Sequence, residues 1–194
     1  MSKRIALLSA AAFGALALTA VVVAPVSAQD KMTKSELSGE KTVMVGGAAM
    51  FPSKNIIQNA VNSKDHTTLV AAVKAAGLVE TLEGKGPFTV FAPTNAAFGK
   101  LPAGTVDTLV KPENKSTLTK ILTYHVVAGK LEASSLTDGK KLKTVEGEEL
   151  TVKKSADKVM IVDAKGGSST VTIPNVNQSN GVIHVVDTIL MPAS

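Results

Sequence analysis

The three histidines, His66, His125 and His184, have the widest chemical range in this sequence, because imidazole serves as metal ligand, proton carrier or hydrogen-bond donor. A zinc site could recruit all three, yet none has a histidine or carboxylate at the spacing typical of metal-binding segments. We therefore favour three separate roles and expect no metal site. His66 precedes a helix in a polar loop, and His125 ends a helix, where a cationic or donor side chain can satisfy free carbonyl groups. His184 falls in a buried strand, where it should donate a hydrogen bond that fixes the packing.

The sequence also lacks the residue patterns that are typical of other catalytic sites. Serine is plentiful, but no Gly-x-Ser-x-Gly turn of a hydrolase occurs. Asp187 follows His184 by three residues, an offset that places the two side chains on opposite faces of a strand. Gly84 and Gly86 precede an expected strand, so they do not form a phosphate loop between a strand and a helix. The sequence predicts no catalytic residue, no cofactor and no enzymatic activity.

The composition narrows the class of protein further. The 194 residues include no cysteine, which excludes a disulfide scaffold, a thiolate metal site, a cysteine nucleophile and a lipidated cysteine. The sequence has 21 basic and 16 acidic residues, which is a mild excess of positive charge. It has neither the basic stripe nor the stacking aromatic residues that are typical of nucleic-acid binding. Two lysine groups favour a solvated face and the protection of edge strands over a polyanion site. They are Lys140, Lys141 and Lys143 in one group and Lys153 and Lys154 in the other.

Residues 1–28 have the pattern of a secretory signal peptide. Lys3 and Arg4 precede a long apolar run, and the small residues Val26 and Ala28 predict cleavage after Ala28. An uncleaved membrane anchor is the alternative, because the apolar run is long enough to cross a bilayer. After cleavage we expect no membrane span, a formal net charge lowered from +5 to +3, and a periplasmic or secreted location.

Periodicity indicates helices in the first half of the remaining chain and strands in the second. We interpret residues 29–54 as a flexible arm and an irregular lead-in. Helices are expected after the N-cap Asn55, from Thr67 to a stop at Gly77, from Thr94 or Asn95 to Phe98, near Val106–Val110 and over Glu113–Tyr124. Strands are expected over Phe88–Ala92, Lys141–Val145, Glu149–Val152, Val159–Asp163, Thr170–Ile173 and Val182–Leu190. Asn180-Gly181 predicts a tight turn with positive φ at both residues. This order of elements indicates an α+β fold.

Three segments resemble the signature blocks of the fasciclin (FAS1) domain family. Phe88–Phe98 resembles the first block, Tyr124–Val127 the central Tyr-His motif and Asn180–Pro192 the closing block, in the order and at the separations of that family. The resemblance covers one domain, residues 55–192, of the small secreted bacterial type. It implies a wedge of two β-sheets with several helices packed on one side. The motif residues that we expect to shape the core and the turns are Phe88, Phe91, Pro93, Asn95, Phe98, Asn180, Gly181 and His184.

The resemblance also implies a function without catalysis. Members of the family are mostly extracellular adhesion or matrix modules, and some animal members contact receptors through the Tyr-His segment. Carried to this chain, that property makes Tyr124 and His125 candidate partner-binding residues, whereas the alternative is that both only close and pack a helix. We therefore expect a secreted binding module that promotes contact with a cell-surface, protein or matrix component. Carriage of an apolar small ligand, a pigment or a lipid, is the alternative function.

Overall fold

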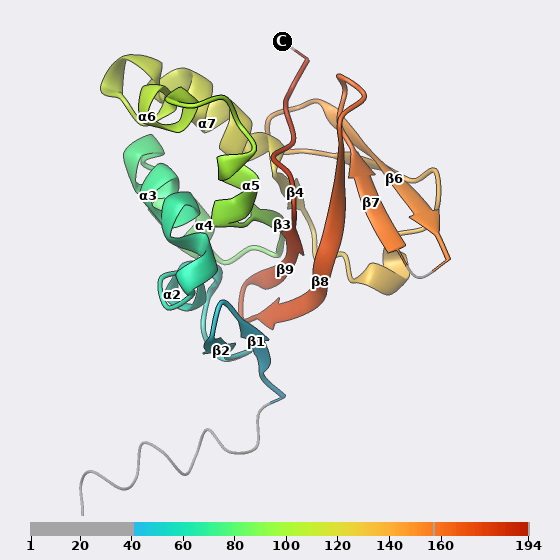
Figure 1. The fold of residues 1–194 in the computed structure, drawn as a ribbon. Coiled ribbons are helices and arrows are strands. Elements are labelled where there is room, and N and C mark those ends of the chain that lie inside the picture. The colour runs from blue at the N-terminus through green and yellow to red at the C-terminus, as the bar shows by residue number, and fades with distance from the viewer. Residues whose placement is uncertain (1–40, 157, 194) are drawn as a thin grey trace, which may run out of the picture. The chain divides into compact units, whose positions relative to one another are not determined.

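The computed structural model describes residues 41–156 and 158–193 (Figure 1). The predicted signal peptide and most of the predicted flexible arm lie outside these residues. The helices are α2 (Ile56–Ala60), α3 (Thr67–Ala76), α4 (Val79–Glu83), α5 (Asn95–Gly99), α6 (Thr105–Leu109) and α7 (Lys115–Tyr124), with short 3-10 helices at Lys64–His66, Pro112–Asn114 and Ala133–Ser135. The strands are β1 (Val43–Val45), β2 (Ala48–Met50), β3 (Phe88–Pro93), β4 (Val126–Ala128), β5 (Lys141–Lys143), β6 (Glu149–Ser155), β7 (Lys158–Val162), β8 (Ser168–Gln178) and β9 (Gly181–Val186).

Seven of these strands form one mixed sheet in the order β4-β3-β9-β8-β7-β6-β5. The neighbours β3 and β9 run parallel, and the other pairs are antiparallel. The two end strands also approach each other, because Val127 of β4 bridges Thr144, and the Val145 N–H donates to the Val126 carbonyl at 2.7 Å. The sheet is therefore almost closed, in the manner of a barrel.

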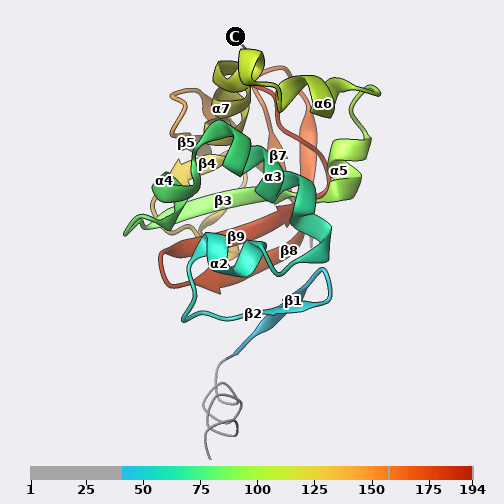
Figure 2. The ribbon, with the colours of Figure 1, turned by 90° about the vertical axis from the view of Figure 1, so that its left-hand side faces the viewer.

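The curved sheet has two halves, one with β4, β3 and β9 and the other with β7, β6 and β5, and strand β8 belongs to both. Its beginning, Ser168–Thr170, pairs with β7, whereas the part from Val171 to Gln178 pairs with β9. Register shifts between Val171 and Val176, with Asn175 at φ 57°, mark the place where the strand bends from one half to the other. The two halves correspond to the two sheets of the expected wedge, and the helices lie on one side of them (Figures 1 and 2). The expected α+β fold is therefore confirmed.

The interior is divided into two apolar clusters, which we call the helix-side core and the strand-side core. In the helix-side core, α2, α3 and α7 pack against β3 and β9 (Figure 2). The strand-side core includes Tyr124 together with buried side chains of β5, β6 and β7. Strand β3 serves both, since Val90 and Ala92 enter the helix-side core and Phe91 enters the strand-side core. The strand is thus buried on both faces.

The helix ends follow the predicted capping residues. The Asn55 side chain accepts from the Gln58 N–H at 2.8 Å and begins α2, and Gly77, at φ 73°, ends α3. Thr94 caps α5, and a 3-10 turn precedes α7, which begins at Lys115 and not at the predicted Glu113. The short elements α4 and β4 have no counterpart in the sequence prediction.

Residues 43–50, expected to be irregular, form the hairpin of β1 and β2 instead. Val45 and Met50 are buried in the helix-side core, and the Gly46 carbonyl accepts from the Lys64 N–H at 3.2 Å. Apolar residues on one side of each strand explain why this segment packs on the domain. The interpretation as an irregular lead-in is therefore wrong for these residues.

Candidate functional site

Four of the predicted site residues come together inside the domain, where α7 ends beside β3. The Phe91 N–H donates to the His125 carbonyl at 2.9 Å, and the Phe91 ring stacks on the His184 ring with centroids 5.7 Å apart. Tyr124 and Phe91 share the strand-side core. The central Tyr-His motif therefore lies against the first and closing signature strands, although these segments are far apart in the sequence.

His125 joins the end of α7 to the segment after β9. Its Nδ1–H donates to the Ile121 carbonyl at 2.8 Å, and its Nε2 accepts from the Leu190 N–H at 3.0 Å. A carbonyl only accepts and an amide N–H only donates, so these partners require a neutral ring with its proton on Nδ1. Burial lowers the pKa of His125 to about 4, although the Ile121 carbonyl and Asp163 favour the charged form. The predicted contact with a free helix carbonyl is present, but the side chain is neutral and 2% exposed.

Tyr124 is completely enclosed, with 0% of its surface exposed. Its hydroxyl accepts from the Ala164 N–H at 2.9 Å and donates to the Glu149 carbonyl at 3.4 Å. Burial raises the pKa of Tyr124, so the hydroxyl stays protonated and the ring acts as an apolar body with a bonded polar end. In this conformation neither Tyr124 nor His125 presents a side chain to a partner, and both connect elements of the fold.

His184 is bonded on both ring nitrogens within the sheet region. Its Nε2–H donates to the Leu131 carbonyl at 2.8 Å, and its Nδ1 accepts from the Asn175 N–H at 3.3 Å. The prediction that His184 donates a packing hydrogen bond is confirmed. Burial lowers the pKa of His184, which keeps the imidazole neutral. The ring holds the bulge of β8 at Asn175 against β9.

His66 directly precedes α3, as predicted, in a turn with the exposed polar residues Lys64 and Asp65, but its own side chain lies in the interior. Only 3% of the residue is exposed, because the β1–β2 hairpin and α3 enclose the turn that carries it. Its Nδ1 lies 2.9 Å from Ser63 Oγ, and Nε2 has no hydrogen-bond partner among the described residues. Burial lowers the pKa of His66 against the opposing influence of the Ala92 carbonyl and Asp65.

A small cavity of about 40 Å³ lies beside His66 in the helix-side core. Its walls come from α2, α3, β3 and β9, with Ile57, Val73 and Ile183 among the lining residues. Ser63, His66 and His125 are the polar residues that line it, and the other lining residues are apolar.

Asn180 and Gly181 shape the start of β9, but not through the predicted turn. Neither residue has positive φ, and the two loop residues between β8 and β9 are Ser179 and Asn180. The buried Asn180 side chain accepts from the Ile56 N–H at 3.1 Å and donates to the Leu82 and Gly84 carbonyls at 2.7 and 2.9 Å. A Cβ atom on Gly181 would collide with the Phe88 carbonyl oxygen. Long-range contacts, and not a local backbone preference, therefore explain this pair.

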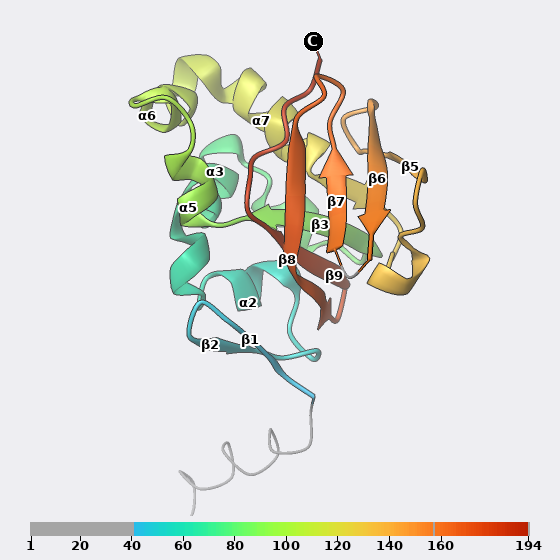
Figure 3. The same ribbon diagram turned by 45° about the vertical axis from the view of Figure 1, so that its right-hand side comes forward.

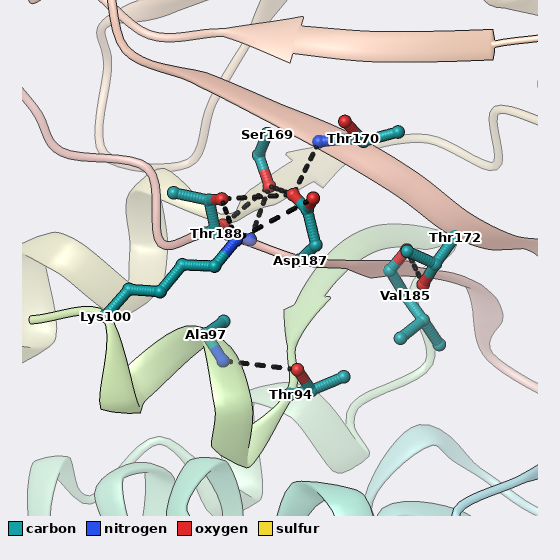
Figure 4. A network of polar contacts seen from close by, with 9 residues as sticks. All are labelled: Thr94, Ala97, Lys100, Ser169, Thr170, Thr172, Val185, Asp187 and Thr188. Atoms are coloured by element: carbon teal, nitrogen blue, oxygen red, sulfur yellow. Dashed lines mark hydrogen bonds and ion pairs between the residues drawn. The ribbon is translucent and has the colours of Figure 1, made fainter.

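Thr94 and Asn95 connect β3 to two helices. Thr94 Oγ1 accepts from the Ala97 N–H at 3.3 Å within α5, as drawn in Figure 4. The Asn95 side chain accepts from the Thr68 N–H at 3.0 Å and donates to the Lys64 carbonyl at 2.8 Å. Asn95 thus caps the start of α3 from another part of the chain.

A polar network that the sequence did not predict surrounds Asp187 (Figure 4). Asp187 Oδ1 accepts from the Thr170 N–H at 2.8 Å and from Thr188 Oγ1–H at 3.0 Å, and Lys100 Nζ lies 3.8 Å from Oδ2. Partial burial opposes ionisation, but the hydrogen bond from Thr170, the Thr188 hydroxyl and Lys100 together lower the pKa of Asp187. The network ties α5 to the ends of β8 and β9. His184 binds other partners, as expected from the three-residue offset.

Within residues 41–156 and 158–193, no group of three histidine, cysteine or acidic side chains is placed to hold a metal ion. None of the helices in this part of the chain is both long and apolar enough to cross a membrane.

Comparison with known proteins matches residues 64–192 to the Fasciclin domain family. Protein sll1483 of Synechocystis sp. is 49% identical over 153 residues, which cover 79% of this chain and 82% of that protein. The cell surface glycolipoprotein MPB83 of Mycobacterium bovis is 40% identical over 76% of this chain and 64% of its own length. The FAS1 domain pair of the insect cell adhesion molecule Fasciclin I has the same fold, with a TM-score of 0.65 at 19% identity. That match covers 73% of this chain and about half, 52%, of the insect chain.

Proposed function

The chain belongs to the Fasciclin domain family, and on that premise we propose that it is an exported, non-enzymatic binding module. It promotes contact between the cell and a surface, matrix or host component. The observation that carries this proposal is that the side chains best suited to acid–base chemistry are buried and hydrogen-bonded inside the domain. His125, His184 and Tyr124 each bridge separate backbone segments in their neutral forms. Contact with a partner is therefore assigned to the surface of the domain.

Two features support a location outside the cytoplasm. The pattern of residues 1–28 is that of a signal peptide cleaved after Ala28. A relative that is 40% identical bears the name of a cell surface glycolipoprotein. We assign residues 29–54 to an arm and lead-in that includes the β1–β2 hairpin, and residues 55–192 to the fasciclin domain.

Tyr124 and His125 support binding indirectly in this proposal. They hold the end of α7 against the strand-side core and against the segment after β9. A partner that contacts this region would touch the loops around the two residues while their rings stay enclosed.

The test is attachment of cells that lack the protein. A strain with the gene deleted should attach to surfaces and aggregate less than its parent, and the exported protein purified from the parent should restore attachment when it is added. The same protein after heat unfolding is the control for nonspecific adsorption. Attachment equal to that of the parent, together with no binding of the purified protein to cells or matrix, would contradict the proposed function.

A second candidate function is carriage of an apolar small ligand, for which the apolar cavity beside His66 marks the place in the helix-side core. The cavity volume of about 40 Å³ is far below the ~300–1,000 Å³ of pockets for drug-sized ligands, so a pigment would have to separate α3 from β3. Solvent extraction of the protein from its own cells, followed by mass spectrometry, tests this function. A colourless protein without extractable lipid or pigment would remove it.

A further inference from the structure

The outer face of strands β5, β6 and β7 carries a row of lysines. Leu142, Leu150, Val152 and Ile161 point into the strand-side core, so the residues that alternate with them point outward. In Figure 3 strands β6 and β7 face the viewer, β5 lies at the right-hand edge, and the helices lie to the left. The exposed lysines on the outward positions are Lys141 and Lys143 of β5, Lys153 of β6 and Lys158 of β7.

The strand register places three of these lysines on one diagonal. Lys141 is opposite Thr151, two residues before Lys153, and Lys158 is opposite Ser155, two residues after Lys153. Successive lysines are therefore diagonal neighbours on adjacent strands, a relation that separates Cα positions by about 7–8 Å. We call Lys141, Lys153 and Lys158 the lysine row.

Protection of a sheet edge does not explain the row. Strand β6 pairs with β5 and β7, and β7 pairs with β6 and β8, so Lys153 and Lys158 lie on interior strands. Strand β5 is itself partly covered by β4 through the Val127–Thr144 bridge. The sequence-based interpretation of Lys153 and Lys154 as guards of an edge strand is therefore wrong.

Few carboxylates neutralise the row. Lys141 Nζ lies 3.1 Å from Glu149 Oε2, and within the described residues no hydrogen bond or ion pair engages the ammonium groups of Lys153 and Lys158. Asp138 flanks the row, and one of its oxygens accepts from the Lys154 N–H at 2.7 Å. The face is therefore positive, with lysines exposed along its length.

An open hollow of about 300 Å³ lies next to Lys153 on this face. Thr151, Ser155 and Asp138 supply polar groups around it, and the half-buried Met160 supplies an apolar surface. The depression combines hydroxyl groups, a thioether and two lysines, Lys153 and Lys154, against the single carboxylate of Asp138. These groups suit a sugar ring that carries a carboxylate.

We propose that the lysine row binds a linear acidic polysaccharide, with a sugar ring over Met160 and successive uronate carboxylates at Lys141, Lys153 and Lys158. This inference rests on the proposed function and names the partner class. The positive charge of this face comes from lysine ammonium groups, because the only arginine in the sequence, Arg4, is in the predicted signal peptide. Residues 138–163 contain no aromatic side chain on which a nucleobase could stack, which favours a polysaccharide over single-stranded nucleic acid.

The test measures binding of the purified exported protein to polygalacturonate, with neutral dextran as the control polymer. Binding to polygalacturonate should weaken as salt is raised, because exposed charge pairs are screened, and dextran should not bind. The variant K141Q/K153Q/K158Q should bind about tenfold more weakly, since each exposed charge pair contributes only a fraction of a kcal/mol. The matched variant K74Q/K111Q/K115Q removes the same charge from exposed lysines of the helical side and should bind like the parent. The charge-preserving variant K141R/K153R/K158R should also retain binding.

Circular dichroism confirms that each variant is folded before binding is compared. Equal weakening by the two glutamine variants, unchanged binding by K141Q/K153Q/K158Q, or binding only to vesicles of phosphatidylglycerol would overturn the inference. If the parent restores cell attachment but does not bind polygalacturonate, the polysaccharide inference fails and the adhesive function stands. If polygalacturonate binds as expected but attachment is not restored, the adhesive function fails and the binding site stands.

Discussion

The Tyr-His segment, Tyr124 and His125, and the lysine row differ in how far their side chains are exposed to solvent. Tyr124 and His125 are enclosed and bonded to backbone groups, whereas Lys141, Lys153 and Lys158 are exposed. The first region carries the resemblance to the family, and the second lies outside its signature blocks. The contrast indicates that the signature residues build the domain, and in the proposed function the surface outside them meets a partner. Under that proposal, fold and function are carried by different residues.

The largest expected effect is a loss of stability when the Tyr-His segment is mutated. Replacing Tyr124 by alanine leaves a cavity in the strand-side core and should lower the free energy of unfolding by about 3–5 kcal/mol. Urea unfolding followed by circular dichroism measures this loss, because Tyr124 is the only tyrosine and its fluorescence disappears with it. Tyr124→Phe is the control, with an expected loss of about 1 kcal/mol for the hydroxyl contacts. A loss below about 1 kcal/mol for Tyr124→Ala would mean that the ring does not support the core.

Acid should destabilise the protein through the enclosed histidines. The pKa of His125 is about 4 in the folded state and near 6.5 when unfolded, so the unfolded chain binds the proton first. This contribution is fully present above about pH 6.5 and is lost as the pH falls toward 4, by roughly 3 kcal/mol in total. His66 and His184, whose pKa values burial also lowers, change stability in the same direction.

Unfolding titrations between pH 4 and 7 measure this dependence. The variant His125→Gln should show a shallower loss of stability over that interval than the parent, even if it is less stable at pH 7. An unchanged slope in His125→Gln would show that His125 is protonated equally in the folded and unfolded states.

A smaller effect is expected at Asp187, which is half-exposed yet belongs to the closing block. Asp187→Ala leaves the Thr170 N–H without its acceptor and should cost about 1–2 kcal/mol, whereas Lys100→Gln should cost under about 0.5 kcal/mol because that ion pair is solvated. Thermal unfolding at low and high salt compares the two variants. Equal losses in both variants would show that the ion pair, and not the backbone hydrogen bond, stabilises this junction.

Local signals in the sequence predicted several elements correctly. Asn55 and Gly77 begin and end helices as expected, because capping depends on neighbouring residues. The hydrogen bond donated by His184 also followed from its position within an apolar strand, although its acceptor did not. These features need no knowledge of distant segments.

Features that depend on distant segments could not be predicted. His66 is buried because the β1–β2 hairpin packs over its turn, and Asn180 is fixed by partners in Ile56 and Leu82. The lysine row exists only through the register of three strands, whose pairing the sequence does not reveal. Spacing along the chain therefore located the family motifs but not the surface assigned to binding.

Lysine footprinting tests the contrast between the two regions most directly. The exported protein would be acetylated with and without polygalacturonate, and the modification of each lysine measured by mass spectrometry. Lys141, Lys153 and Lys158 should be protected by the polysaccharide, with Lys74, Lys111 and Lys115 modified equally in both samples. Protection of the helical lysines, or equal modification of the lysine row in both samples, would contradict it.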